Sequence, residues 1–324
     1  MARGHSGLPK GGPLTLSKST LLLALNQIDR DSRARQRVLE IESRFRAKIG
    51  NHVANLPAAE SAFAKFSTSP FVLMMYSQRN HYSRISQIEG DILPAKLFSS
   101  METSAGRMIE EILLPVFGWQ CVLSEMHSSN SSLDGRRREG NVLKVATLKS
   151  GPRCLNDEMS ENFADAIISH APTWAEEAGV RHLDFTYGVL YGTEKRSNKK
   201  DWHILRNLAE KLPDTCFHEH PHNRWHCRFT HQGIDTTATI RIGKTWWDFL
   251  GGPTCFIELC TALIRACVRP GEFDADDYGY TISDLAEIVS TRNVPEAFNS
   301  ALLQRSQITW LFFLARHFCD SLTD

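Results

Sequence analysis

The sequence lacks an excess of either charge. Its 324 residues carry 37 Lys and Arg against 37 Asp and Glu, which gives a formal net charge of zero. A zero balance argues against histone-like or tail-driven binders of polyanions, whose affinity comes from total positive charge. It does not exclude a DNA enzyme, because a local basic patch can supply the field while acids elsewhere cancel the sum.

Long hydrophobic runs and paired cysteine motifs are also missing. The longest early run, Leu21 to Leu25, is far shorter than the roughly 20 apolar residues of a membrane helix and too short for a secretory signal. The eight cysteines contain no CxxC pair and mostly have apolar neighbours, as reduced thiols do in a cytoplasmic protein. We therefore expect a cytoplasmic chain with no membrane partner.

What the sequence does contain is the composition of a globular protein, with 42% hydrophobic and 23% charged residues. Residues 1–15, rich in Gly and Pro, predict a flexible arm. Residues 16–324 predict a single domain. Its helical N-terminal part covers 16–100, an α/β core covers 101–270 and C-terminal helices cover 271–324.

The middle of the chain holds the predicted strands, which are rich in β-branched and apolar residues. They cover 119–126, 141–150, 180–193 and, as a hairpin or strand pair, 231–243. Helices are expected over 104–118 and 156–170, where apolar residues recur at helical spacing. Strands in the middle and helices at both ends predict an α/β (α+β) fold, with a central mixed β-sheet flanked by helices and helical decoration at the N- and C-termini.

Asp134 and Lys149 supply the residue types that metal-assisted hydrolysis of a phosphodiester needs. Asp134 leads through a basic loop into a strand that ends in Lys149. A carboxylate can hold the metal ion that neutralises phosphate charge and activates water, and a lysine beside it stabilises the charge of the transition state. The alternative is an acidic surface turn followed by a lysine whose stem lies along apolar surface.

The two predicted helices carry carboxylates that can face such a site. On the first, Glu110 lies nearer the buried stripe than Glu111. On the second, Glu161 lies at the edge of the stripe and Glu158 points nearly away from it. We therefore select Glu110 and Glu161 as candidates.

Asp134, the apolar strand ending in Lys149, the following SGP and the helix after it resemble the core of the PD-(D/E)XK nucleases. The preceding SAGRMIEE helix resembles the helix ahead of the first metal-binding Asp in type II restriction endonucleases, notably those that read CCGG-like or CCNGG-like cores. The resemblance covers about residues 79–195 and implies a sheet of restriction-endonuclease type. It implies Asp134 as metal ligand, Lys149 as catalytic lysine and Glu110 as a further carboxylate, with Mg²⁺ as cofactor.

The same resemblance implies sequence-specific hydrolysis of double-stranded DNA, leaving 5′ phosphates, by a homodimer that cuts both strands of a palindrome. The sequence departs from the family at Thr147, where the family usually carries Glu or Asp. Some relatives supply the missing carboxylate from the following helix, which would make Glu161 a metal ligand. Glu110 or Glu158 could also replace the missing carboxylate. If none of the three does, the chain is a catalytically inactive, sequence-specific DNA-binding protein on a nuclease-like fold.

Several polar residues near this segment are candidates for DNA contacts. They are Arg84, Arg136, Arg137, Arg138, Arg153 and Asn156. The arginine trio after Asp134 can hold phosphates, and a solvated turn explains it equally well. Arg or Asn in the loop before a helix can read base edges. A further basic cluster, Lys195, Arg196, Lys199 and Lys200, is typical of a solvated face.

The stretch 218–227, HEHPHNRWHC, gathers four histidines and Cys227. Zinc requires ligands within tetrahedral reach of one another, and this spacing matches no standard finger. We expect an exposed loop between strands. A zinc protein or small-molecule enzyme built around this cluster is the third interpretation.

Overall fold

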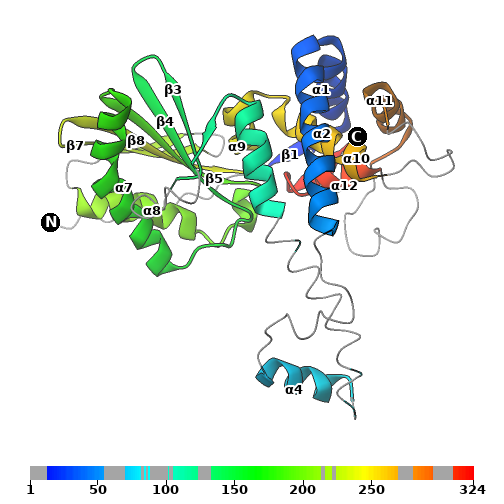
Figure 1. Ribbon diagram of the computed structural model, residues 1–324, viewed down its shortest axis with the longest axis horizontal. Helices are drawn as coiled ribbons and strands as arrows, with labels where there is room; N and C mark the ends of the chain where they lie inside the picture. The colour runs from blue at the N-terminus through cyan, green and yellow to red at the C-terminus, as the bar shows by residue number, and fades with distance from the viewer. Residues whose placement is uncertain are drawn as a thin grey trace.

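The computed structural model describes residues 13–54, 70–81, 84, 87, 101, 105–122, 133–212, 216–220, 224–268, 280–294 and 309–324. It confirms the predicted fold class, because a mixed sheet with helices packed on it lies beside a body of helices (Figure 1). In chain order the strands of the sheet are β2 (Gln120–Cys121), β3 (Gly135–Glu139), β4 (Val142–Lys149), β5 (His182–Val189), β6 (Cys216–His220), β7 (Arg224–His231) and β8 (Ile234–Ile242). Their order in space is β2-β3-β4-β5-β8-β7-β6.

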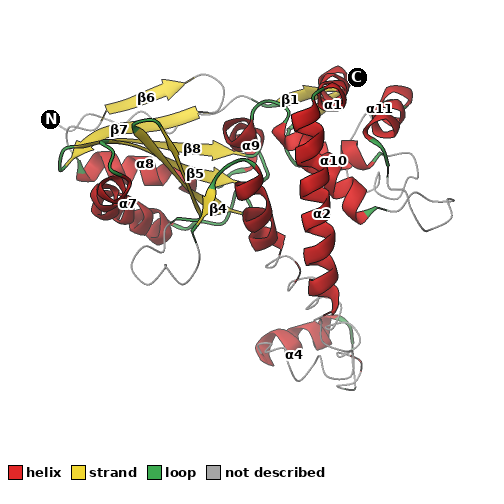
Figure 2. Ribbon diagram, turned by 45° about the horizontal axis from the view of Figure 1, so that its top comes forward, coloured by secondary structure: helices red, strands yellow, loops and turns green. Residues whose placement is uncertain are grey.

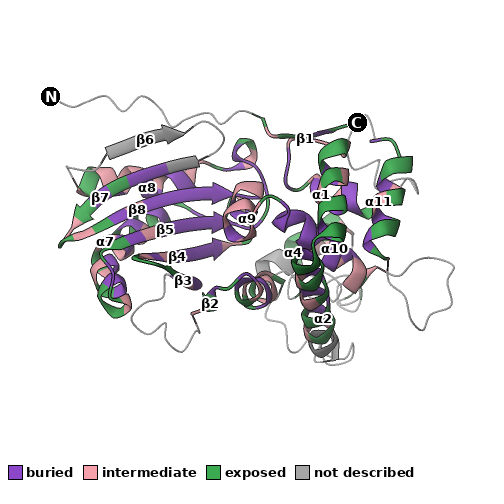
Figure 3. Ribbon diagram, turned by 90° about the horizontal axis from the view of Figure 1, so that it is seen from above, coloured by how far each residue is buried: buried purple, intermediate pink, exposed green. Residues whose placement is uncertain are grey.

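The three central strands, β4, β5 and β8, run parallel, and the strands outside them pair antiparallel. Most of their residues are buried (Figure 3), as expected for strands with helices on both faces. Parallel strands end at the same edge of a sheet, and here Lys149, Val189 and Ile242 are in register at that edge. The loops that follow β4, β5 and β8 therefore meet beside Lys149.

One face of the sheet is covered by α7 (Asp157–Ala178) and α8 (Lys200–Lys211), which follow β4 and β5. A short 3-10 turn, η2 (Glu194–Arg196), precedes α8. The Asn156 side chain caps α7, and the helix ends at Gly179 with φ 62°. It runs eight residues past the predicted end at His170, through Pro172, because Trp174 and Ala175 continue its buried stripe.

The other face is covered by a helix over residues 105–116 and by α9 (Lys244–Gly251). The helical body beside it consists of α1 (Lys18–Arg30), α2 (Ser32–Ala54), α10 (Cys255–Cys267), α11 (Ile282–Thr291) and α12 (Trp310–Ala315). One continuous hydrophobic core joins these helices to the sheet residues Ala146 and Leu148. In this body Arg37 of α2 donates two hydrogen bonds of 2.7 Å to the fully buried Glu258 of α10.

The beginning and end of the described chain meet in this body. Strand β1 (Thr15–Ser17) pairs parallel with β9 (Ser321–Thr323). The N-terminal and C-terminal helices, which the sequence presents as separate segments, therefore share one core. Helix α4 (Pro70–Arg79) lies away from the sheet, beyond the end of α2 (Figure 1 and Figure 2).

Two sequence predictions are wrong at the level of secondary structure. Residues 135–139, predicted as a basic loop, form β3. The histidine stretch, predicted as an exposed loop, supplies two paired strands, β6 and β7, with His226 and Cys227 buried. Residues 1–12 of the predicted arm and 123–126 of the predicted strand lie outside the described residues.

Among the described residues, no single helix is long and apolar enough to cross a membrane. Only α9 and α10 taken together reach that length and composition, with a bend of 99° between them.

Candidate functional site

Lys149 is the last residue of β4 and lies at the carboxyl edge of the parallel strands. Side chains alternate along a strand, so Lys149 projects from the same face as Val145 and Thr147, the face that α7 covers. Its ammonium lies 5.8 Å from the centre of the Phe163 ring on α7, within the range at which an aromatic face attracts a cation. The strand and the ring together hold a half-buried cation at the edge of the sheet.

Asp134 immediately precedes β3 and is tied to β4 at two points. Its backbone N–H donates to the Ala146 carbonyl at 2.8 Å, and its Oδ2 accepts the Leu148 N–H at 2.6 Å. Gly135 pairs with Ala146 in the antiparallel register, so Asp134 lies opposite Thr147. The carboxylate is therefore fixed beside the end of β4, one strand away from Lys149.

Glu110 is half-buried in the helix over 105–116, whereas Glu111 is exposed. This confirms the prediction that Glu110 is the more inward of the two carboxylates. The start of the same helix lies against the loop after β4, because a Cβ built on Gly106 would be 3.9 Å from the Ser150 Cβ. Glu110 therefore approaches the end of β4 from the side opposite α7.

The charges of Asp134 and Lys149 both act on the Glu110 carboxyl. Burial raises the pKa of Glu110 from its ordinary 4.5 to about 7. The charge of Asp134 adds to the rise, and the charges of Lys149 and Arg107 oppose it. A carboxyl whose pKa lies near 7 in a partly enclosed site is a functional-site candidate.

Thr147, the position where the resemblance implies an acid, is a neutral residue at 2% exposure. Its hydroxyl has no hydrogen-bond partner in the described part of the chain. Tyr187 of β5 lies opposite it in the parallel register, with its ring 5.6 Å from Phe163. Burial raises the pKa of Tyr187 above its ordinary value, so the phenol stays protonated at neutral pH. Thr147 and Tyr187 therefore add no charge beside Lys149.

Glu161 does not join this group. It is exposed, and its carboxylate lies 3.4 Å from the Lys211 ammonium, which also binds Asp165 at 2.5 Å. Glu161 and Phe163 are two residues apart on α7, so they lie about 160° apart around the helix axis. Phe163 contacts Lys149, and Glu161 therefore points away from it. Glu158 is exposed as well. The structure thus brings together three of the four predicted catalytic residues and places the fourth on the side of α7 that faces α8.

The donor set decides which metal can fit. The described residues contain no group of three or more His, Cys, Asp and Glu side chains arranged to hold a metal ion. Glu110 and Asp134 offer two carboxylates, and Mg²⁺ is commonly bound through one or two carboxylates, waters and the phosphates of the substrate. A cation would also oppose the two causes that raise the pKa of Glu110, which are burial and the charge of Asp134. With only these two carboxylates, a Mg²⁺ ion here would need water and phosphate oxygens to complete its coordination.

The arginine trio is integrated into the fold and is not a solvated turn. Arg136, Arg137 and Arg138 lie in β3, which runs from Asp134 toward the amino end of β4, away from Lys149. The partners are Gln120 for Arg136, the Phe117 carbonyl and the Trp119 ring for Arg137, and the carbonyls of Gly140 and Ala178 for Arg138. These contacts connect β3 to its neighbours.

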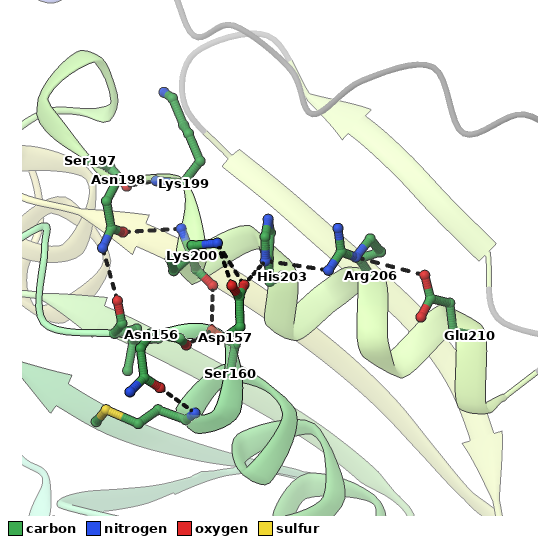
Figure 4. Close-up of polar contacts among 12 residues, drawn as sticks. Asn156, Asp157, Ser160, Ser197, Asn198, Lys199, Lys200, His203, Arg206 and Glu210 are labelled. Carbon is green, nitrogen blue, oxygen red and sulfur yellow. Dashed lines mark hydrogen bonds and ion pairs between the residues drawn. The ribbon is translucent and has the colours of Figure 1, made fainter.

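The first turn of α7 is tied to α8 by polar contacts (Figure 4). Asn156 accepts the Met159 N–H at 2.8 Å and so serves as the helix cap. Asp157 binds Lys200 at 2.6 Å and His203 at 2.8 Å. Lys200, a member of the predicted basic cluster, is therefore paired with Asp157. Asn156 has a structural role as the cap of α7.

The two remaining DNA-contact candidates are both exposed. Arg153 donates from Nε to the Arg196 carbonyl at 3.1 Å. Arg84 lies in a turn closed by Gln87, and most of the residues around it in sequence lie outside the described ranges.

Two contributors to the site, Phe163 and Tyr187, were missed. The sequence places Phe163 on the buried stripe of a predicted helix and Tyr187 within a predicted strand, but only the parallel register of β4 and β5 brings Tyr187 beside Thr147. Only the packing of α7 on the sheet brings Phe163 to Lys149. The one signal in the sequence was the near-continuous apolar character of both strands, which is typical of adjacent parallel strands.

Compared with models of known protein families and with curated proteins, the sequence matches none of them. A functional conclusion therefore depends on the geometry of the site.

Proposed function

We propose that this chain is a Mg²⁺-dependent endonuclease that cuts double-stranded DNA at a specific sequence and leaves 5′ phosphates. The observation that carries the proposal is the approach of Glu110, Asp134 and Lys149 to one another at the carboxyl edge of β4. Two carboxylates beside one lysine are the residue types that metal-assisted hydrolysis of a phosphodiester requires.

Each residue has a role that follows from its surroundings. Asp134 and Glu110 would hold the metal, which when bound neutralises phosphate charge and lowers the pKa of a bound water. Asp134 is held in place by the Leu148 N–H. Burial raises the pKa of Glu110 to about 7, and a bound cation would favour its charged form. Lys149 stabilises the negative charge that develops on the phosphate or on the attacking water.

The DNA partner, the cytoplasmic location and a homodimer belong to the same proposal. Cutting both strands of a palindrome needs two such sites related by a two-fold axis.

The test is cleavage of a long unmethylated DNA with and without Mg²⁺, followed by gel electrophoresis. We expect discrete fragments that need Mg²⁺, and a loss of cleavage by roughly 100-fold or more in Asp134→Ala and Lys149→Ala, since each removes charge stabilisation of the transition state. Glu161→Gln is the matched control, because that carboxylate is exposed and paired with Lys211. Full activity in Asp134→Ala, or no activity in Glu161→Gln, would contradict the assignment.

Thr147 favours a second candidate, a DNA-binding protein on the same fold that does not cut. A neutral residue stands where the resemblance implies a metal ligand, and it is buried. This candidate predicts specific DNA binding that needs no divalent ion, and intact DNA under both Mg²⁺ and Mn²⁺.

A further inference from the structure

A row of aromatic rings reaches the surface at the carboxyl edge of the sheet. We call it the ring row; it consists of Tyr191, His317, Phe313 and Trp310. Successive ring centres lie 6.4, 5.1 and 6.0 Å apart, each pair in an edge-to-face arrangement. Tyr191 at one end is 44% exposed and Trp310 at the other is 50% exposed. The two exposed ends belong to one row of contacting rings, so they form an apolar surface that a partner can cover.

The ring row begins beside the candidate site. Tyr191 follows β5 by two residues, and Lys149 pairs with Val189 at the end of that strand. A Cβ built on Gly151 would lie 2.9 Å from the Tyr191 hydroxyl, so the loop directly after Lys149 touches this ring. A ligand that contacts Tyr191 therefore lies next to the loop that directly follows Lys149.

Hydrogen bonds fasten the Tyr191 and His317 end of the ring row. The Gly192 N–H donates to the His317 carbonyl at 2.8 Å. Arg196 of η2 donates to the carbonyls of Arg316 and Cys319 at 3.3 and 3.1 Å. These bonds fasten the loop after β5 to the turn after α12, and they give Arg196, a member of the predicted basic cluster, a structural role. A fixed platform binds a flat ligand with little ordering cost.

The loops after β4 and β5 contact the ring row, and the exposed charged residues in these two loops are both positive. Lys195 of η2 is exposed, and so is Arg153, which the Arg196 carbonyl orients. The acids of this corner are turned inward: Glu194 is 2% exposed, and Asp320 accepts the Thr193 hydroxyl at 2.6 Å. The surface therefore suits an anion that also presents flat apolar faces.

We propose that the ring row with Arg153 and Lys195 binds an unpaired stretch of nucleic acid next to the site of cleavage. Bases stack on exposed aromatic side chains while cations follow the phosphates, and this combination tolerates any sequence. In a duplex the faces of the bases are covered by their neighbours, so the rings select single-stranded or unstacked nucleotides. This proposal rests on the proposed function, which identifies the ligand as DNA. It adds that the surface next to the site binds that DNA in a single-stranded form.

The experiment is fluorescence anisotropy of a dye-labelled oligothymidine, with EDTA present so that no cleavage can occur. We expect the wild-type chain to bind it, and Tyr191→Ala and Trp310→Ala each to weaken binding about tenfold, as the loss of one stacked base does. Trp310→Phe keeps a ring and should restore most of the affinity. Leu39→Ala is the matched control, because Leu39 is 49% exposed but lies on α2. Thermal melting of each variant establishes that it is folded.

Three results would overturn the proposal. The first is unchanged oligothymidine binding in both alanine variants, and the second is binding of duplex DNA only. The third is a change of oligomeric state in Trp310→Ala, seen by light scattering, with unchanged oligothymidine binding, which would make the ring row a protein contact. None of these outcomes depends on Mg²⁺ cleavage, so loss of cleavage in Lys149→Ala still tests the nuclease separately.

Discussion

Removing the charge of Glu110 should stabilise the folded chain at alkaline pH. In the folded state this carboxyl keeps its proton up to about pH 7, against 4.5 ordinarily, chiefly because it is buried and because Asp134 repels its charged form. Between these two values the folded state binds more protons than the unfolded state, so its stability falls as pH rises through that window. Glu110→Gln has no such titration and escapes the loss.

The size of the effect follows from the same two values. A difference between 4.5 and about 7 corresponds to about 3 kcal/mol at pH 8, at 1.36 kcal/mol per pKa unit. Because the side chain is only half-buried, solvent screening reduces this to about 2 kcal/mol. An unfolding entropy of about 2.1 cal/mol/K per residue converts it to roughly 3 °C for a chain of this length.

The assay is thermal unfolding of wild type and Glu110→Gln in EDTA at pH 5 and pH 8. We expect nearly equal Tm values at pH 5 and a Tm roughly 3 °C higher for the variant at pH 8. Glu111→Gln is the control, since that carboxylate is exposed and pairs with Lys48; its Tm difference from wild type should not depend on pH. A Tm difference for Glu110→Gln that is the same at both pH values would refute the reasoning.

Three further predictions concern the scaffold and are measured by urea denaturation. Gly188→Ala should cost about 1–3 kcal/mol, because its Cβ would lie 2.8 Å from the Trp246 ring; no loss would mean that the ring can move. Gly179→Ala should cost about 1 kcal/mol through backbone strain alone, since φ is 62° and no atom lies within 4 Å, and Gly179→Asn should cost less. Arg37→Met should lower the free energy of unfolding by about 3–5 kcal/mol, because the buried Glu258 loses its ion-pair partner. Adding Glu258→Leu should recover most of this loss. A double variant no more stable than Arg37→Met would contradict this.

The central strands were predictable because their burial dictates their composition. The segment ending in Lys149 is β-branched and apolar, and it forms β4 within two residues of the predicted bounds. Strand β3 was missed because three successive arginines are typical of a solvated loop. In the fold, each arginine reaches a carbonyl, an amide or a ring on a neighbouring segment, and such distant partners leave no trace in local sequence.

The same limit explains how far the site could be predicted. Spacing along the helix over 105–116 was enough to choose Glu110 over Glu111, because the choice depends only on helical periodicity. On α7 the periodicity also allowed Glu161 at the edge of the buried stripe, but it could not say which edge faces β4. That depends on the pairing of α7 with α8, where Lys211 binds Glu161.

Thr147 offers a test of the site that needs no DNA. Its side chain is 2% exposed and lies opposite Asp134 in the register of β3 and β4. Thr147→Asp, which is similar in size, would add a second buried carboxylate there and should destabilise the chain in EDTA by about 3 kcal/mol or more, since a buried charge without a partner is costly. A divalent cation held by the carboxylates would offset this cost, so excess Mg²⁺ should raise the Tm of Thr147→Asp more than that of wild type.

Thr147→Val separates this effect from packing. It removes a buried hydroxyl that has no hydrogen-bond partner among the described residues, so its stability should equal or exceed that of wild type, with no added response to Mg²⁺. If Thr147→Asp is as stable as Thr147→Val in EDTA, position 147 is not in the electrostatic reach of Asp134 and Glu110. If Thr147→Asp is destabilised but Mg²⁺ does not raise its Tm, the two carboxylates do not form a cation site, and the binding-only function becomes the better account of this fold.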